Sequence, residues 1–95
     1  MIDVAVSGAM GRLGSAISNG ISADGNMRLS GLYAPGHEGE ELAGLSACTE
    51  PEDLSGDVVV ECSHPDAVMN NLRTWHRKGF RVVVGTSGFS ENRLA

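Results

Sequence analysis

The sequence is poor in aromatic residues, cysteine and basic residues, and it has no long hydrophobic run. Only four of its 95 residues are aromatic, so aliphatic side chains must build most of any core. No apolar stretch approaches the roughly 18 residues that a membrane-spanning helix needs. The amino terminus is too short and too acidic for a signal peptide. We therefore expect a soluble, cytoplasmic protein that contacts no membrane.

The two cysteines, Cys48 and Cys62, lie fourteen residues apart without a CxxC spacing. This argues against a disulfide framework and against a zinc site. Acidic residues outnumber basic ones by twelve to seven, and no basic stripe indicates nucleic-acid binding. We expect reduced thiols, no bound metal and no nucleic-acid partner.

Apolar, β-branched runs alternate with amphipathic segments along the chain. Strands are predicted at 2–6, 27–33, 57–62 and 81–84, of which the first, third and fourth are expected to be buried, and helices at 12–23 and from 64 to 78. Minor elements are a loop at 35–44, a short edge strand within 45–50, one helical turn at 51–55 and a final helix from Ser90. The second helix should bury Val68, Leu72 and Trp75, with Met69 and His76 beside them. This alternation predicts an α/β fold, a Rossmann-like doubly wound parallel sheet with helices on both faces. A chain of this length has room for one domain, residues 1–95.

Glycine is abundant, and the stretch SGAMGRLG places three glycines directly after the first strand. Gly8 can supply a sharp turn, Gly11 would let a pyrophosphate approach the backbone, and Gly14 would let the helix pack tightly on the strand. The helix amino terminus offers N–H groups and a positive dipole to phosphates. The GxxGxxG spacing differs from the common GxGxxG, so a purely structural turn remains an alternative. A P-loop is excluded because no Gly-Lys-Ser/Thr follows.

The adenosine end of a dinucleotide site usually has an acidic residue about twenty residues after the glycines, which holds the ribose of NAD. Ala34 stands at that place. His37 or Arg12 could serve the ribose or the 2'-phosphate of NADP instead. The sequence therefore leaves the preference between NADPH and NADH open.

Other residues whose side chains can take part in catalysis have simpler interpretations. His64 precedes Pro65 and is interpreted as a loop or capping residue rather than a general acid. Cys62 is interpreted as a small apolar filler at a strand end. Asp57 and Glu61 are expected at opposite ends of one strand or against helix amino termini, and not in a paired-carboxylate site.

The segments SGAMGRLG, DVVVECSHPDAVMNNL and VVVGTSGFSENRL together resemble the nucleotide-binding domain of the 4-hydroxy-tetrahydrodipicolinate (dihydrodipicolinate) reductase family. The resemblance covers nearly the whole chain. It implies a reductase that passes a hydride from NADPH or NADH to a cyclic, imine-like dicarboxylate in bacterial lysine (diaminopimelate) biosynthesis. The cofactor-binding positions that it implies are Gly8, Ala9, Met10, Gly11, Arg12 and Leu13 at the pyrophosphate, Ala34 at the ribose, and Gly85, Thr86 and Ser87 beneath the nicotinamide.

The same resemblance places the family's catalytic residues in a second, C-terminal domain beyond this chain. No residue here is given a catalytic role, and the 95-residue fragment is expected to be inactive alone. A homo-oligomer, a tetramer in the family, and an exposed sheet edge or apolar patch are expected. A stand-alone dinucleotide-binding module, which senses or regulates without catalysis, is the alternative.

Overall fold

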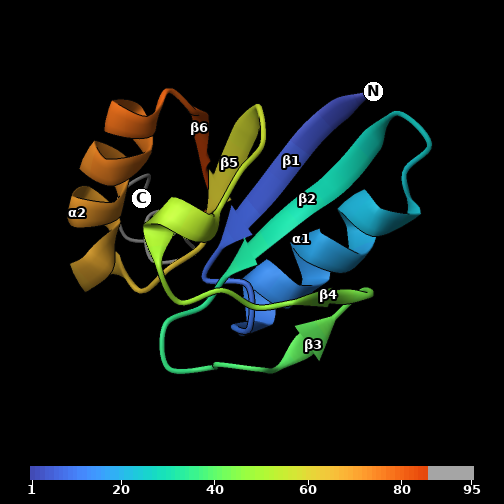
Figure 1. The fold of residues 1–95 in the computed structure, drawn as a ribbon, viewed down its shortest axis with the longest axis horizontal. Helices are drawn as coiled ribbons and strands as arrows, with labels where there is room; N and C mark the ends of the chain where they lie inside the picture. The colour runs from blue at the N-terminus through green and yellow to red at the C-terminus, as the bar shows by residue number, and fades with distance from the viewer. Residues whose placement is uncertain (86–95) are drawn as a thin grey trace, which may run out of the picture.

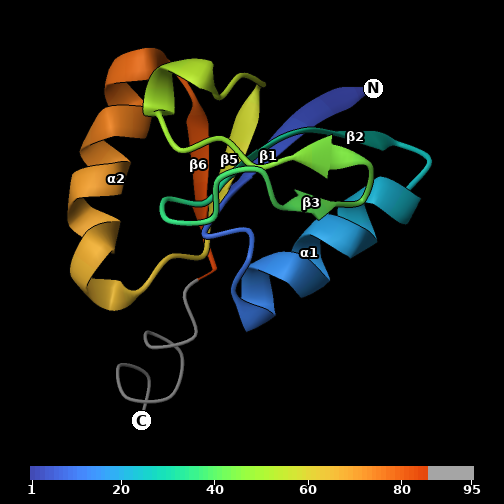
Figure 2. The same ribbon diagram turned by 60° about the horizontal axis from the view of Figure 1, so that its bottom comes forward.

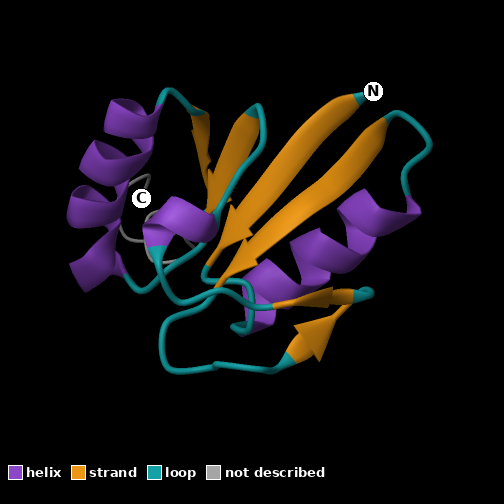
Figure 3. Cartoon of the chain, viewed as in Figure 1, coloured by secondary structure: helices purple, strands orange, loops and turns teal. Residues whose placement is uncertain are grey.

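The computed structural model describes residues 1–85, which form a four-stranded sheet with one helix on each face (Figures 1 and 3). All the strand pairs in this sheet are parallel, and their order is β2-β1-β5-β6. The elements are β1 (Ile2–Ser7), α1 (Arg12–Ala23), β2 (Met27–Tyr33), β3 (Glu41–Leu42), β4 (Leu45–Ser46), the 3-10 turn η1 (Pro51–Asp53), β5 (Val58–Glu61), α2 (Pro65–Lys78) and β6 (Arg81–Val84).

Alternating side chains of β1 point to two separate cores. Val4 and Val6 pack with Ile21 of α1 on one face of the sheet. Ala5 packs on the other face with Trp75 of α2. Figures 1 and 2 show the two helices on opposite sides of the strands. The doubly wound α/β fold predicted from the sequence is therefore confirmed.

The ends of α2 follow from local sequence. Pro65 occupies the first turn, and the Nδ1 atom of His64 accepts a hydrogen bond from the Asp66 amide at 3.3 Å. His64 is thus the N-cap, as its position before a proline predicted. Gly79 ends the helix in the left-handed conformation, with φ 89°. Neither α1 nor α2, the helices in the described part of the chain, is long and apolar enough to cross a membrane.

The segment predicted as a plain loop contains a small hairpin. β3 pairs with β4 in antiparallel fashion through a two-residue turn, Ala43-Gly44. Both turn residues have positive φ, at 52° and 83°, which is the geometry that tight hairpins prefer. The hairpin was hard to predict because Asn-Gly or Asp-Gly is the usual signal for this turn, and Ala-Gly stands here instead.

Two burial predictions are wrong. The β6 strand was expected to be buried, but Val83 and Val84 are 54% and 45% exposed because β6 is the outer strand of the described sheet. On α2, Val68 and Trp75 are buried, whereas Met69 is 57% exposed and His76 is exposed. Met69 lies one residue, or about 100° of helix rotation, beyond Val68, so it turns away from the sheet. The helix expected from Ser90 lies outside the described residues.

Candidate functional site

The sheet reverses its winding direction at β1, with β2 on one side and β5 on the other. Ser7 and Glu61, the last residues of β1 and β5, are paired neighbours. In open parallel sheets, ligands bind beyond the carboxyl ends of the strands at such a switch point. A hollow of about 300 Å³ lies there and is lined by Gly8, Met10, Gly11, Ala34, Pro35, His37, Cys62, Ser63 and His64.

Gly8 and Gly14 are glycines because the fold leaves no room for a side chain. Gly8 has φ +77°, and a Cβ on it would lie 2.7 Å from both the Cys62 carbonyl carbon and the Ser63 nitrogen. A Cβ on Gly14 would overlap the Gly8 carbonyl oxygen and lie 2.8 Å from its carbon. The sharp turn and the close helix packing predicted for these two positions are both present.

Gly11 differs from these two glycines because neither its backbone angles nor the packing of the described residues requires a glycine there. Its backbone has ordinary angles, φ -75° and ψ 174°, and no side chain of the described residues caps α1 at this position. Apart from the neighbours of Gly11 in the chain, the one described atom within 4 Å of a Cβ at this position is the Gly8 carbonyl oxygen, at 3.4 Å. Since Gly11 lines the hollow, its small size leaves space for a ligand at the amino terminus of α1. This cradle fits a phosphate group, which helix amino termini bind through N–H groups.

The far end of the hollow lies beyond β2. Ala34 is buried, at 3% exposed, and its amide donates to the Cys48 carbonyl at 2.9 Å. His37 also lines the hollow, and its Nδ1 lies 2.7 Å from a carboxylate oxygen of the exposed Glu40. Arg12 is exposed and is not among the residues that line the hollow.

A buried polar network, which the sequence analysis missed, lies behind the hollow. The fully buried Glu61 carboxylate accepts hydrogen bonds from Trp75 Nε1 at 2.7 Å, the Ser63 amide at 3.1 Å and Asn71 Nδ2 at 3.2 Å. The Ser63 hydroxyl lies 3.2 Å from the Ser7 hydroxyl. The Ser63 hydroxyl also accepts a hydrogen bond from Asn71 Nδ2 at 3.1 Å. A signal was present: Asn71 and Trp75 are four residues apart and share one helix face.

Cys62 contributes packing rather than reactivity. Burial, with a smaller contribution from the neighbouring Glu61, raises the pKa of its thiol to about 11. The thiolate is the reactive form of cysteine, so a raised pKa lowers the reactivity of this thiol near neutral pH. Gly85, the residue after β6, lies close to Cys62, since a Cβ on Gly85 would lie 3.5 Å from the Cys62 sulfur. Thr86 and Ser87 lie outside the described residues.

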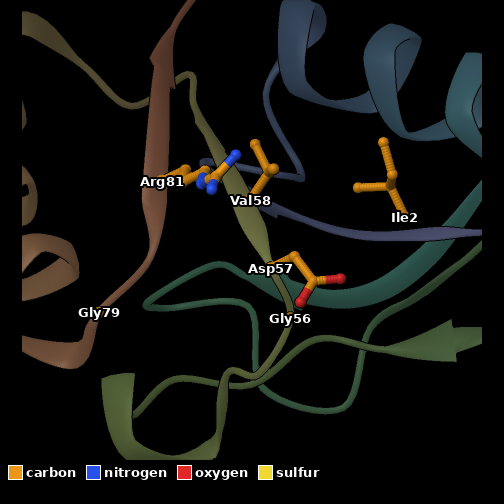
Figure 4. Close-up of a pocket in the computed structure, with 6 residues that line it drawn as sticks. All are labelled: Ile2, Gly56, Asp57, Val58, Gly79 and Arg81. Atoms are coloured by element: carbon orange, nitrogen blue, oxygen red, sulfur yellow. The ribbon is translucent and has the colours of Figure 1, made fainter.

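A second hollow, of about 440 Å³, opens at the opposite edge of the sheet and is lined by Ile2, Gly56, Asp57, Val58, Gly79 and Arg81 (Figure 4). It lies where β1, β5 and β6 begin, away from the strand ends at which parallel sheets bind ligands. Asp57 is found here, at the other end of β5 from Glu61, so the two acids form no pair. The described residues contain no cluster of potential metal ligands.

Comparison with known protein families identifies relatives of this chain. The family model described as dihydrodipicolinate reductase, N-terminus, matches residues 2–95. A 4-hydroxy-tetrahydrodipicolinate reductase from Thermobifida fusca is 40% identical over 95 residues, which cover 100% of this chain and 34% of the relative. The enzyme of the same name from Corynebacterium urealyticum is 37% identical over 93 residues, covering 98% and 34%. The chain therefore spans about a third of the length of these relatives.

Solved structures share the fold. A dipicolinate-bound dihydrodipicolinate reductase from Paenisporosarcina sp. TG-14 superposes with a TM-score of 0.70 at 23% identity, covering 99% of this chain and 40% of that one. An aspartate semialdehyde dehydrogenase with NADP from Candida albicans gives a TM-score of 0.72 at 20% identity, covering 97% and 31%.

Proposed function

Because this chain belongs to the dihydrodipicolinate reductase family and corresponds to the N-terminal part of its members, we propose that residues 1–95 are the NAD(P)H-binding domain of such a reductase. One observation carries this proposal. Gly11 lines the hollow at the sheet's switch point, yet among the described residues beyond its chain neighbours a Cβ on it would meet one atom within 4 Å, the Gly8 carbonyl oxygen. The room that Gly11 leaves in the hollow is not explained by packing within the described residues, and it supports a bound ligand there.

The coenzyme would lie across the carboxyl ends of β2, β1 and β5. Its pyrophosphate would contact the turn formed by Gly8, Ala9, Met10, Gly11, Arg12 and Leu13, where the dipole of α1 favours negative charge. Its adenosine ribose would lie near Ala34 and His37, and its nicotinamide near Gly85, Thr86 and Ser87. No carboxylate occupies the position of Ala34, so both NADPH and NADH are proposed as ligands.

Bound NAD(P)H supplies the hydride, and the chain's own residues hold and orient it. The proposed reaction of the whole protein is reduction of a cyclic dihydrodipicolinate-type dicarboxylate in lysine biosynthesis. We propose that its catalytic residues come from a second domain, and that the whole protein is a cytoplasmic homo-oligomer. Cys62 and His64 border the hollow, but the raised pKa of the thiol and the capping bond of the imidazole assign them structural roles.

A chimeric enzyme tests the reductase assignment. The chain would replace the N-terminal third of the Thermobifida fusca relative, and oxidation of NADPH or NADH would be followed by absorbance with the dihydrodipicolinate-type substrate present and absent. We expect substrate-dependent oxidation by the chimera and none by the 95-residue chain. A folded chimera that binds the coenzyme but never oxidises it would contradict the reductase assignment and favour a stand-alone binding module.

A further inference from the structure

We propose that Glu61 is a positioning residue for the coenzyme. Its carboxylate fixes Ser63, and with it the loop between β5 and α2, against the glycine turn that follows β1. This inference rests on the proposed function, because the loop that Glu61 fixes is one wall of the proposed coenzyme site. Glu61 lies behind that wall and itself is not among the residues lining the hollow.

The burial of Glu61 is the first step of the argument. The residue is 0% exposed at the end of an otherwise apolar strand, and burying a carboxylate is costly unless hydrogen bonds compensate it. Both of its oxygens are engaged. Oε1 accepts from the indole N–H of Trp75 at 2.7 Å, while Oε2 accepts from the Ser63 amide at 3.1 Å. One side chain therefore ties the core of the domain to the wall of the site.

The contacts of Ser63 carry that constraint to the glycine turn. The hydroxyls of Ser63 and Ser7 are 3.2 Å apart, and Ser7 directly precedes Gly8. A Cβ on Gly8 would lie 2.7 Å from the Ser63 nitrogen, so these two backbones are already in close contact. Asn71 reinforces the arrangement from α2, because its Nδ2 lies 3.1 Å from the Ser63 hydroxyl and 3.2 Å from Glu61 Oε2. A shift of Ser63 would therefore alter the opening into which the pyrophosphate fits.

The substitution Glu61→Gln separates positioning from simple packing. Glutamine has nearly the same shape, but it offers one carbonyl oxygen and one NH2 group in place of two acceptor oxygens. The NH2 group must then face a donor, either the Trp75 indole or the Ser63 amide with Asn71. The network breaks at one of its two ends with little change in volume.

The experiment uses the 95-residue chain as wild type, Glu61→Gln, Asn71→Ala and the matched control Glu41→Gln, which alters an exposed acid on the β3 hairpin. Calorimetry with NADPH is run at a temperature at which each variant is folded. We expect about tenfold weaker binding for Glu61→Gln, because coenzyme binding must then re-impose the loop position that the lost hydrogen bond to the carboxylate held in the free chain. Asn71→Ala should weaken binding by about threefold, since it keeps the Trp75 and Ser63 bonds to Glu61. The control should bind as wild type does.

The single indole N–H resonance of Trp75 provides a readout that a merely structural role would not move. We expect NADPH to shift it in the wild type, because Glu61 links the indole to the wall of the site, and to shift it less in Glu61→Gln. Wild-type affinity in a folded Glu61→Gln chain overturns the positioning role and leaves the proposed function intact. If Glu61→Gln does not fold, wild-type affinity in Asn71→Ala overturns it. A wild-type chain that binds neither NADPH nor NADH overturns the proposed function, and this inference with it.

Discussion

Replacing Gly11 with alanine should weaken coenzyme binding strongly while leaving the fold nearly unchanged. The backbone at this position suits alanine, and in the described part of the chain the new Cβ would meet, beyond its chain neighbours, the Gly8 carbonyl oxygen at 3.4 Å. Alanine is a poorer N-cap than glycine, which costs roughly 0.5–1 kcal/mol. The reduced freedom of the unfolded chain returns about 0.4–1 kcal/mol. The free energy of unfolding should therefore change by less than about 1 kcal/mol.

The effect on binding should be much larger. The added methyl group stands where the backbone of Gly11 lines the hollow, so it would push a pyrophosphate away from the amino terminus of α1. Losing one or two hydrogen bonds to a charged phosphate, at about 1.5–3 kcal/mol each, weakens binding by about 100-fold, or 2.7 kcal/mol. Calorimetry with NADPH measures this directly, and urea denaturation measures the stability.

Two glycines of α1 provide comparisons, one expected to leave binding unchanged and one expected to lower stability. Gly20 is exposed on α1 with nothing within 4 Å of an added Cβ, so Gly20→Ala should stabilise the chain by about 0.5–1 kcal/mol and bind normally. Gly14→Ala should destabilise by about 3 kcal/mol or more, because its Cβ would overlap the backbone of Gly8. The reasoning is refuted if Gly11→Ala binds NADPH as tightly as the wild-type chain.

Three further predictions concern other parts of the domain. Trp75→Ala should lower the free energy of unfolding by about 3–5 kcal/mol, measured by urea denaturation, because the indole is fully buried; a loss below about 1 kcal/mol would contradict this. Iodoacetamide should alkylate Cys62 of the folded chain slowly at pH 8 and faster towards pH 11, since burial raises the pKa of its thiol to about 11; mass spectrometry after timed quenching would show this, and rapid modification at pH 8 would disprove it. Glu40→Gln should raise the affinity for NADPH relative to NADH by about threefold, because it removes a negative charge 2.7 Å from His37 at the ribose end. An unchanged ratio of the two affinities in calorimetry would show that His37 does not contact the coenzyme.

The main elements were predictable from sequence because local and tertiary preferences agree in them. The helix predicted at 12–23 and the strand predicted at 27–33 have the observed bounds. In both, the spacing of the apolar residues and the glycines nearby indicate the same boundaries. The family resemblance, carried by the glycine turn and the DVVVECSHPDAVMNNL segment, is confirmed by the family match over residues 2–95.

The failures have physical reasons. An apolar run such as 81–84 is typical of a buried strand, but burial depends on how many strands lie beside it, which the run itself does not reveal. The role of Glu61 was missed because an acid at a strand end is usually solvated, and its two side-chain donors, Asn71 and Trp75, lie ten and fourteen residues away on α2. Only the packing of α2 against β5 brings them together.

An amide NMR titration of the 95-residue chain with NADPH and, separately, with NADH would locate the coenzyme site on the domain. The spectrum of the free chain establishes that it is folded before the coenzyme is added. The account predicts that the largest shifts fall on the turn at 8–13 and the loop at 62–64, around the hollow at the switch point. It is contradicted if a folded chain shows no shifts with either coenzyme, or if the shifts gather instead around Asp57 and Arg81 at the opposite edge of the sheet.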